Sequence, residues 1–174
     1  ARLGYPQGQF RALTSLGLTH SQLGNLVLTL DSYQQALQLG EDLREVANVA
    51  RLHNNLGTFY QVQGDLDLAL LHCARSVEMM RSVKEIHENG RWYATALNSL
   101  GVTYRLMGRN EDALRAHQEA LAEARSAAAR GASYADAVVA ATLTRIGAIH
   151  LDVGRYTEAR AALEQSMRLR EQLE

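Results

Sequence analysis

A short motif that occurs four times with one internal spacing is the feature that most constrains the fold. Each copy has leucine or isoleucine followed by glycine, a tyrosine or histidine three residues after that glycine, and a second glycine seven residues after it. The first glycines are Gly17, Gly57, Gly101 and Gly147, and the second glycines are Gly24, Gly64, Gly108 and Gly154. A fixed register of this kind predicts an array of similar structural units.

Within each copy the apolar residues recur at steps of three and four residues, which is typical of one face of an α-helix. A new helical pattern starts after the second glycine. Because glycine adopts a left-handed conformation at little cost, we expect each second glycine to end a helix. Pro6 is the single proline, and runs of valine, isoleucine and threonine are few, so helices are favoured over strands. The predicted fold class is therefore all-α.

Each copy predicts one hairpin of two helices. The first helices are expected near residues 8–23, 43–63, 91–107 and 134–153. The second helices are expected near residues 26–39, 66–86, 110–129 and 156–173. These ranges give hairpins near 8–39, 43–86, 91–129 and 134–173 within a single domain, 1–174. Because the chain starts with Ala1 and not with methionine, we interpret it as part of a longer protein.

The first glycine of each copy lies in the middle of a predicted helix, where glycine costs roughly 1 kcal/mol relative to alanine. Four recurrences of this cost predict that the two helices of a hairpin approach each other closely there. We expect the small residues Ala69, Ala113 and Ala159 of the second helices to meet these glycines.

The register resembles the tetratricopeptide repeat, whose pattern reads Leu-Gly, two residues, Tyr, then Gly, then Ala and an aromatic residue. Residues 56–69 and 100–113 match this pattern well, whereas His20 and His150 replace the tyrosine. The first glycines are 40, 44 and 46 residues apart, and a basic unit has about 34 residues. Such long units are similar to those of kinesin light chains and of bacterial signalling proteins. The resemblance implies a right-handed superhelical solenoid of about four hairpins.

In solenoids of helical hairpins the first helices line the concave side. Polar residues on the predicted first helices near each Leu-Gly pair are candidates for binding a partner there. They are Arg51, Asn54, Asn55, Asn98, Arg105 and Arg145, with Arg11, Thr14, Ser15, Ser99 and Thr144 beside them. Arginine binds carboxylates with two hydrogen bonds, and asparagine can both donate to and accept from a peptide backbone. Asp152 is the clear acidic residue on this side. The expected partner is a protein or an extended, acidic peptide.

The last helix carries Ala162, Ser166, Leu169 and Leu173 at helical spacing, and no further helix follows to cover them. Burying a leucine contributes roughly 1.5–3 kcal/mol. We therefore expect this strip to form a homo-oligomer contact through Leu169 and Leu173, or to pack on a neighbouring domain.

Composition excludes several classes of function. The formal net charge of −1 argues against nucleic-acid binding. The sequence has no apolar run of about 18 residues, so no membrane span is predicted. The single cysteine, Cys73, is compatible with a reducing, cytoplasmic setting. The histidines lack the spacing of a zinc site, and no glycine-rich phosphate loop occurs. We expect no catalytic residue, metal or cofactor.

The leading functional hypothesis is a non-enzymatic scaffold that binds a protein or peptide in the concave groove. The resemblance places it as a sensor or interaction region of a bacterial signalling or regulatory protein. Two alternatives stay open: a regulatory phosphatase-like protein that acts on a response regulator, and a structural spacer for dimerisation.

Overall fold

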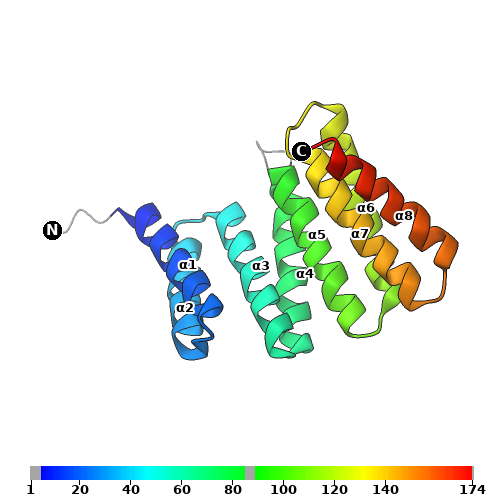
Figure 1. Ribbon diagram of the computed structural model, residues 1–174. Coiled ribbons are helices and arrows are strands. Elements are labelled where there is room, and N and C mark those ends of the chain that lie inside the picture. The colour runs from blue at the N-terminus through cyan, green and yellow to red at the C-terminus, as the bar shows by residue number, and fades with distance from the viewer. Residues whose placement is uncertain (1–4, 85–88, 174) are drawn as a thin grey trace.

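The computed structural model describes residues 5–84 and 89–173. Over these residues the chain forms eight α-helices and no strand. The helices are α1 (Pro6–Gln22), α2 (Leu26–Asp42), α3 (Val46–Gln63), α4 (Leu66–Val83), α5 (Asn89–Leu106), α6 (Asn110–Ala129), α7 (Ala135–Asp152) and α8 (Tyr156–Glu171). Consecutive helices pair as hairpins, which stack in sequence order with the two chain ends far apart (Figure 1). The predicted all-α, right-handed superhelical solenoid of four hairpins is confirmed.

The second glycine of each copy follows its helix, as predicted. Gly24, Gly64, Gly108 and Gly154 have φ angles between 73° and 79°, the left-handed region that glycine tolerates best. No heavy atom lies within 4 Å of the place where a side chain at any of them would begin. Conformation, and not close packing, therefore requires glycine at these four turns.

The connection between the first two hairpins differs from its prediction. Helix α2 continues to Asp42, past the predicted end at residue 39, and α3 begins at Val46. Gly40 lies inside the helix, where Val49 and Phe10 pack against it and leave no room for a side chain. A Cβ there would lie 2.7 Å from Val49 Cγ2 and 2.8 Å from Phe10 Cε2. The turn is made instead by Arg44, whose φ is 55°. The last two residues predicted for the fourth helix, 85–86, lie outside the described residues.

The first glycine of each copy is a point of close approach between the two helices of a hairpin. A Cβ on Gly101 would lie 2.6 Å from His117 Cε1, and one on Gly147 would lie 2.8 Å from Leu163 Cγ. At Gly57 the first obstacle is Cys73 Sγ, and at Gly17 it is the ring of Tyr33. Close approach is thus confirmed. Of the expected partners, Ala69 and Ala159 do meet Gly57 and Gly147, through their carbonyl oxygens at 3.4 and 3.3 Å, but the nearest atoms belong to other side chains. The obstructing side chain lies four residues after the alanine position of each copy. That is about one turn further along the second helix, where a side chain longer than alanine points at the glycine.

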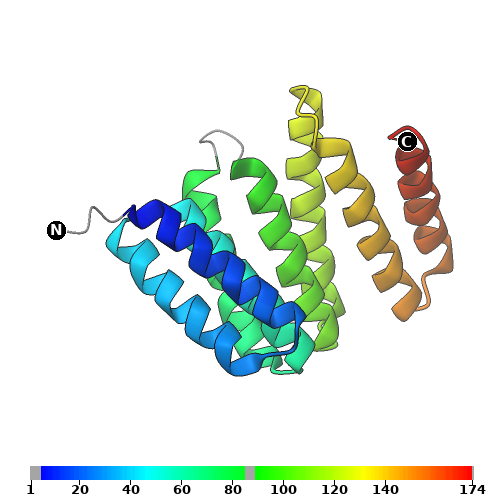
Figure 2. The same ribbon diagram turned by 60° about the vertical axis from the view of Figure 1, so that its left-hand side comes forward.

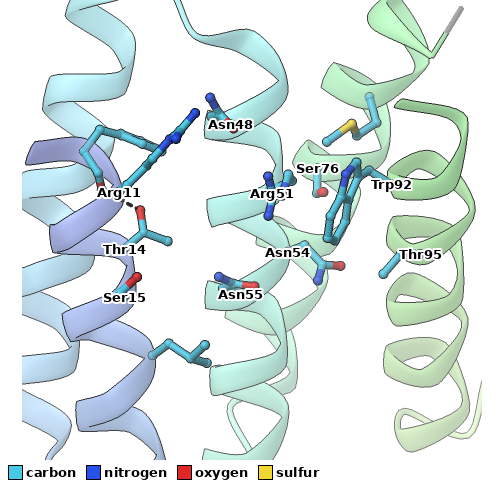
Figure 3. Close-up of a pocket in the computed structure, with 13 residues that line it drawn as sticks. Arg11, Thr14, Ser15, Asn48, Arg51, Asn54, Asn55, Ser76, Trp92 and Thr95 are labelled. Carbon is cyan, nitrogen blue, oxygen red and sulfur yellow. Dashed lines mark hydrogen bonds between the residues drawn. The ribbon is translucent and has the colours of Figure 1, made fainter. Parts of the chain in front are cut away.

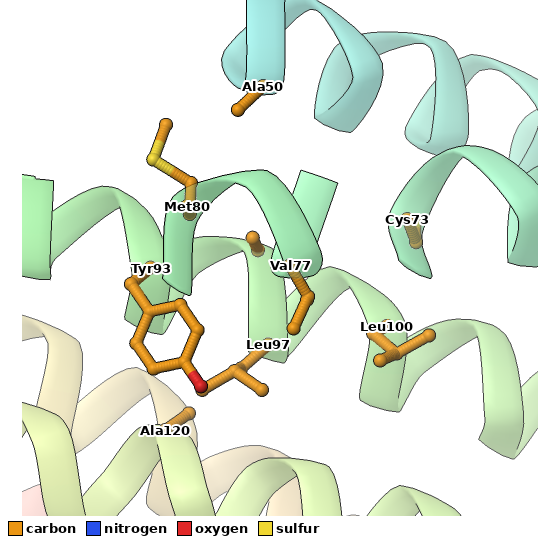
Figure 4. Packing of buried hydrophobic residues seen from close by; sticks show 9 residues of the cluster. Ala50, Cys73, Val77, Met80, Tyr93, Leu97, Leu100 and Ala120 are labelled. Carbon is orange, nitrogen blue, oxygen red and sulfur yellow. The ribbon is translucent and has the colours of Figure 1, made fainter. Parts of the chain in front are cut away.

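Three clusters of buried side chains form the core, and each one spans the boundary between neighbouring hairpins. The central cluster joins Ala50 of α3 and Met80 of α4 to Leu97 of α5 and Ala120 of α6 (Figure 4). Equivalent clusters link α1 and α2 to α3 and link α6 to α7 and α8. Burial therefore continues along the whole stack, which holds the first helices α1, α3, α5 and α7 beside one another. A view from another side shows the same order of hairpins (Figure 2).

Candidate binding groove

Two adjacent cavities lie along the first helices. The N-terminal cavity, of about 510 Å³, is lined mainly by α1, α3 and the first turns of α5. The C-terminal cavity, of about 470 Å³, lies between α5 and α7. Thr95 of α5 lines both cavities, so they are neighbours along the first helices, and the two together are called the groove. This groove is the candidate binding site.

Helical spacing explains which side chains reach the groove. On α3 they are Asn48, Arg51 and Asn55, at steps of three and four residues. Thr95 and Asn98 continue the same kind of stripe on α5. Figure 3 shows the N-terminal cavity, with side chains of α1 and α5 directed toward α3 from its two sides. The apolar wall there includes Phe10, Met80 and Trp92.

The groove carries positive charge, with the carboxylate of Glu45 at its N-terminal edge, where it accepts from Asn48 Nδ2 at 3.0 Å. Its arginines are Arg11, Arg51, Arg91 and Arg145. Among the described residues, no aspartate or glutamate lines either cavity, and none of these four arginines forms an ion pair. Burial lowers the pKa of the Arg51 guanidinium, and the charges of Arg11 and Arg91 lower it further. The groove is therefore matched to a negatively charged ligand.

Trp92 lies between two of these charges. The guanidinium carbon of Arg51 is 3.9 Å from the Trp92 ring centroid, and that of Arg91 is 5.6 Å from it. Cation–π attraction holds the Arg51 side chain against the indole and so positions it at the cavity wall. Figure 3 shows Arg51 and Trp92 facing each other across the space between α3 and α5.

The structure brings five of the six predicted binding residues to the groove. Arg51, Asn54 and Asn55 line the N-terminal cavity together. Asn98 and Arg145 line the C-terminal cavity. The Arg145 side chain is partly buried and donates from Nη1 to the Ala141 carbonyl at 3.0 Å. Burial is also the main reason that the pKa of Arg145 is lowered.

The side-chain amide of Asn98 is engaged within the fold. Asn98 is 7% exposed, and its Nδ2 donates to Thr142 Oγ1 at 2.8 Å. Its Oδ1 accepts from His117 Nδ1 at 2.8 Å. The amide thus joins α5 to α6 and α7, which favours a structural role, and a partner contact by Asn98 stays a prediction.

Arg105 does not line either cavity. It forms a two-pronged ion pair with Asp152 of α7, with Nε–Oδ2 at 2.5 Å and Nη2–Oδ1 at 3.1 Å. The hydrogen bond from Arg105 lowers the pKa of the Asp152 carboxyl. Since Asp152 already pairs with this arginine, Arg105 is less available to an acidic partner, and its role as a partner contact stays a prediction.

The predicted strip on α8 faces the protein itself. Ala162 and Ser166 are buried, and Ser166 Oγ donates to the Ala140 carbonyl of α7 at 2.7 Å. Leu169 is half-buried against the cluster shared by α6, α7 and α8. The expectation that the strip is exposed is therefore wrong, because α8 uses it to pack on its hairpin partner. Self-association stays a prediction, with Met167 (57% exposed) and Leu173 (49% exposed) as the available apolar side chains.

Several groove residues were not predicted from the sequence. Arg91, Trp92 and Asn48 lie in the first turns of their helices, a full turn or more before the Leu-Gly pair. Extending each polar stripe backwards at steps of three and four residues would have found Asn48 and Arg91. Ser76 belongs to a second helix and reaches the cavity from behind Arg51, so the search along first helices passed over it.

The histidines pack within and between hairpins. His53 Nδ1 and His72 Nδ1 lie 2.9 Å apart, and His72 stacks on Tyr60. Burial lowers the pKa of His53 to about 4, with the charge of His72 contributing. In the part of the chain that the structure describes, no group of three or more histidine, cysteine, aspartate or glutamate residues is arranged to hold a metal ion. Nor does any described helix combine the length and apolar character needed to cross a bilayer.

Comparison with known proteins agrees with this architecture. Two family models, both described as tetratricopeptide repeat, match residues 48–126 and 139–174. The crystal structure of BtubC (BKLC) from P. vanneervenii superposes with a TM-score of 0.78 at 18% identity, covering 99% of this chain and 67% of that one. The crystal structure of MamA gives a TM-score of 0.66 at 18% identity, covering 94% of this chain and 79% of that one. No curated protein matches the sequence. At such identities the two structures establish likeness of fold.

Proposed function

Since the chain belongs to the tetratricopeptide repeat family, we propose that it is a scaffold that binds an extended, acidic segment of a partner protein in the groove along α1, α3, α5 and α7. Repeats of this family generally serve protein interaction without catalysis. The proposal adds three points to the general role of the family: the location of the site, the negative charge of the partner and the signalling context.

The observation that carries the proposal is the unequal pairing of charge on the two sides of the solenoid. Ion pairs between described residues, apart from Arg105–Asp152, involve the second helices and their ends, as in Arg75–Glu78 and Arg160–Glu164. The groove arginines form no ion pair with the described residues, although Glu45 lies in a small cavity beside Arg11. Unpaired guanidinium groups in a partly enclosed groove attract carboxylates more strongly than the same groups on an open surface.

The neutral groups of the groove favour an extended peptide. Asn48, Asn54 and Asn55 follow one another along α3, and the side-chain amide of each can both donate and accept. An extended chain exposes its backbone N–H and C=O groups, which such amides can pair. Two neighbouring cavities of about 510 and 470 Å³ fit a segment of several residues better than one compact ligand.

The long repeats resemble those of bacterial signalling proteins, and on that resemblance we assign the scaffold to a signalling or regulatory protein. A cytoplasmic setting belongs to the same proposal. The unpaired thiol of Cys73 supports it.

A peptide array tests the proposal. Acidic, neutral and basic peptides of matched length are probed with the wild-type chain and with an Arg51→Glu/Arg91→Glu variant. Both arginines are exposed, so we expect the variant to stay folded. The wild-type chain should capture acidic peptides, and the variant should lose at least about tenfold in affinity, because two attractive charges become repulsive.

An Arg155→Glu/Arg168→Glu variant is the matched control. It changes the net charge equally, at exposed positions outside the groove, and should bind like the wild type. Equal losses in both double variants would show a general charge effect. Capture that ignores peptide charge would contradict the proposal.

A further inference from the structure

The N-terminal cavity has more positive charge than one carboxylate can balance. Arg11 of α1 and Arg51 of α3 both line it, and the Arg51 guanidinium carbon lies 3.9 Å from the Trp92 ring centroid (Figure 3). Arg91 lines the neighbouring C-terminal cavity. The like charges of Arg11 and Arg51 repel each other, and a bound anion relieves that repulsion.

Two neutral groups of this cavity lack a partner. Ser76 is 0% exposed, and its hydroxyl makes no hydrogen bond with the described residues. The buried Oδ1 of Asn54 likewise accepts none. Buried polar atoms are nearly always hydrogen-bonded, so unpartnered atoms beside an arginine cluster indicate a place for ligand atoms.

We propose that the N-terminal cavity anchors a phosphorylated serine or threonine side chain of the bound segment. This inference rests on the proposed function and names the group that the groove selects. A phosphoryl group carries a charge of about −1.5 to −2 and three strong acceptor oxygens. It can therefore bond two guanidinium groups at once, those of Arg11 and Arg51, and leave an oxygen for a hydroxyl such as Ser76. A carboxylate has two oxygens and one charge, and satisfies a single guanidinium.

The unpaired Asn54 Oδ1 favours a phosphopeptide over a free phosphate. This oxygen is an acceptor, and a backbone N–H next to the phosphorylated residue can donate to it, which free phosphate does not supply. Thr95 lines both this cavity and the C-terminal cavity, so the flanking residues have a second cavity beside the first.

Trp92 is the single tryptophan of the sequence, so its fluorescence reports on this site. Degenerate peptides without tryptophan are prepared with a central phosphoserine, serine or glutamate, and their binding is followed by Trp92 emission and by anisotropy of a dye on the peptide. We expect the phosphoserine peptides to bind at least about tenfold more tightly than the glutamate peptides and to change Trp92 emission. Inorganic phosphate and free phosphoserine serve as small-anion probes and should bind far more weakly than the peptides.

Arg11→Gln and Arg51→Gln should each bring the phosphoserine peptides down to the affinity of the glutamate peptides. Arg11→Gln leaves the Trp92 contact of Arg51 intact, so it keeps the test decisive if Arg51→Gln disturbs the fold. Arg155→Gln, at an exposed position outside the groove, should leave the peptide affinities unchanged.

Equal affinity for phosphoserine and glutamate peptides would overturn the phosphoryl anchor, while the proposed binding of acidic peptides in the groove would still hold. Binding of free phosphoserine as tightly as the peptides would also overturn it. Failure of every charged peptide would contradict the proposed function itself.

Discussion

At the scale of single residues, the mid-helix glycines set how closely the helices of a hairpin approach. Gly57 lies directly against the Cys73 side chain, and a Cβ there would also lie 3.2 Å from the Cys73 nitrogen and 3.4 Å from the Ala69 carbonyl oxygen. Cys73 is fully buried, so its sulfur has little room to move. The missing side chain is therefore a packing requirement and outweighs the low helix propensity of glycine.

We expect Gly57→Ala to lower the free energy of unfolding by up to about 2 kcal/mol. Overpacking a core costs roughly 1–3 kcal/mol, against a gain of roughly 1 kcal/mol in helix propensity. Adding Cys73→Ala removes the main obstacle, so the double variant should lose less than the sum of the two single losses. Urea unfolding of the four proteins measures this coupling. Strict additivity would show that the two residues do not compete for the same space.

A second prediction at this scale concerns His117, which is fully buried. Burial, with the charges of Arg145 and Arg105, lowers its pKa to about 4, whereas an unfolded histidine titrates near about 6.5. Between these values the unfolded chain binds more protons than the folded one. The free energy of unfolding should therefore fall as the pH falls through this window, by up to about 1.4 kcal/mol per pH unit from this residue. Urea unfolding from about pH 7.5 to about pH 4.5 measures the slope.

His117→Gln removes the titrating group and keeps a hydrogen-bond donor for Asn98. Its slope in the same pH range should be shallower than that of the wild type, whatever its stability at neutral pH. Identical slopes would show that His117 does not titrate as a buried neutral residue.

At the scale of helices, hydrogen bonds between side chains tie one repeat to the next. Gln61 of α3 donates from Nε2 to the Ser99 carbonyl at 2.9 Å and to Thr103 Oγ1 at 2.7 Å on α5. Asn98 of α5 reaches Thr142 of α7 in the same direction. These bonds, like the core clusters, cross the boundaries between hairpins. They fix the angle between repeats and hence the shape of the groove.

Asn98 and Asn55 provide a matched pair for a test of these roles. Asn98→Ala leaves the His117 Nδ1–H buried without an acceptor, so it should lower the free energy of unfolding by roughly 1–3 kcal/mol. Asn55→Ala changes a partly exposed residue of the groove and should stay within about 0.5 kcal/mol of the wild type. Thermal or urea unfolding compares them. A stable Asn98→Ala protein would contradict the structural role of Asn98 and favour it as a ligand contact.

Helix type, number and turn positions could be predicted from the sequence because the glycine register repeats. Gly64 and Gly108 end their helices for reasons local to the chain. The side-chain partners of Asn98 and Arg105 could not be predicted in this way. Their partners, Thr142 and Asp152, are more than forty residues away, and the packing angle between repeats decides whether they meet. The same angle brings Arg91 and Trp92 of α5 next to Arg51 of α3.

At the scale of the whole molecule, the solenoid separates its charges although their sum is near zero. The formal net charge is −1, yet the groove holds four arginines that form no ion pair with the described residues. Ion pairs such as Arg81–Glu119 and Lys84–Glu123 join second helices of neighbouring hairpins. The outer layer thus uses its charges to hold repeats together, and the inner layer keeps its charges available for a partner.

The most direct test of the acidic-peptide groove is to map the contact surface by NMR. Backbone amide, arginine side-chain and Trp92 indole resonances are recorded with increasing amounts of the tightest acidic peptide from the array. The groove predicts shifts at Arg51, Asn54, Asn55, Arg91 and Trp92, with Arg160 on α8 unchanged. Shifts confined to α4, α6 and α8, with the Trp92 indole unmoved, would contradict it.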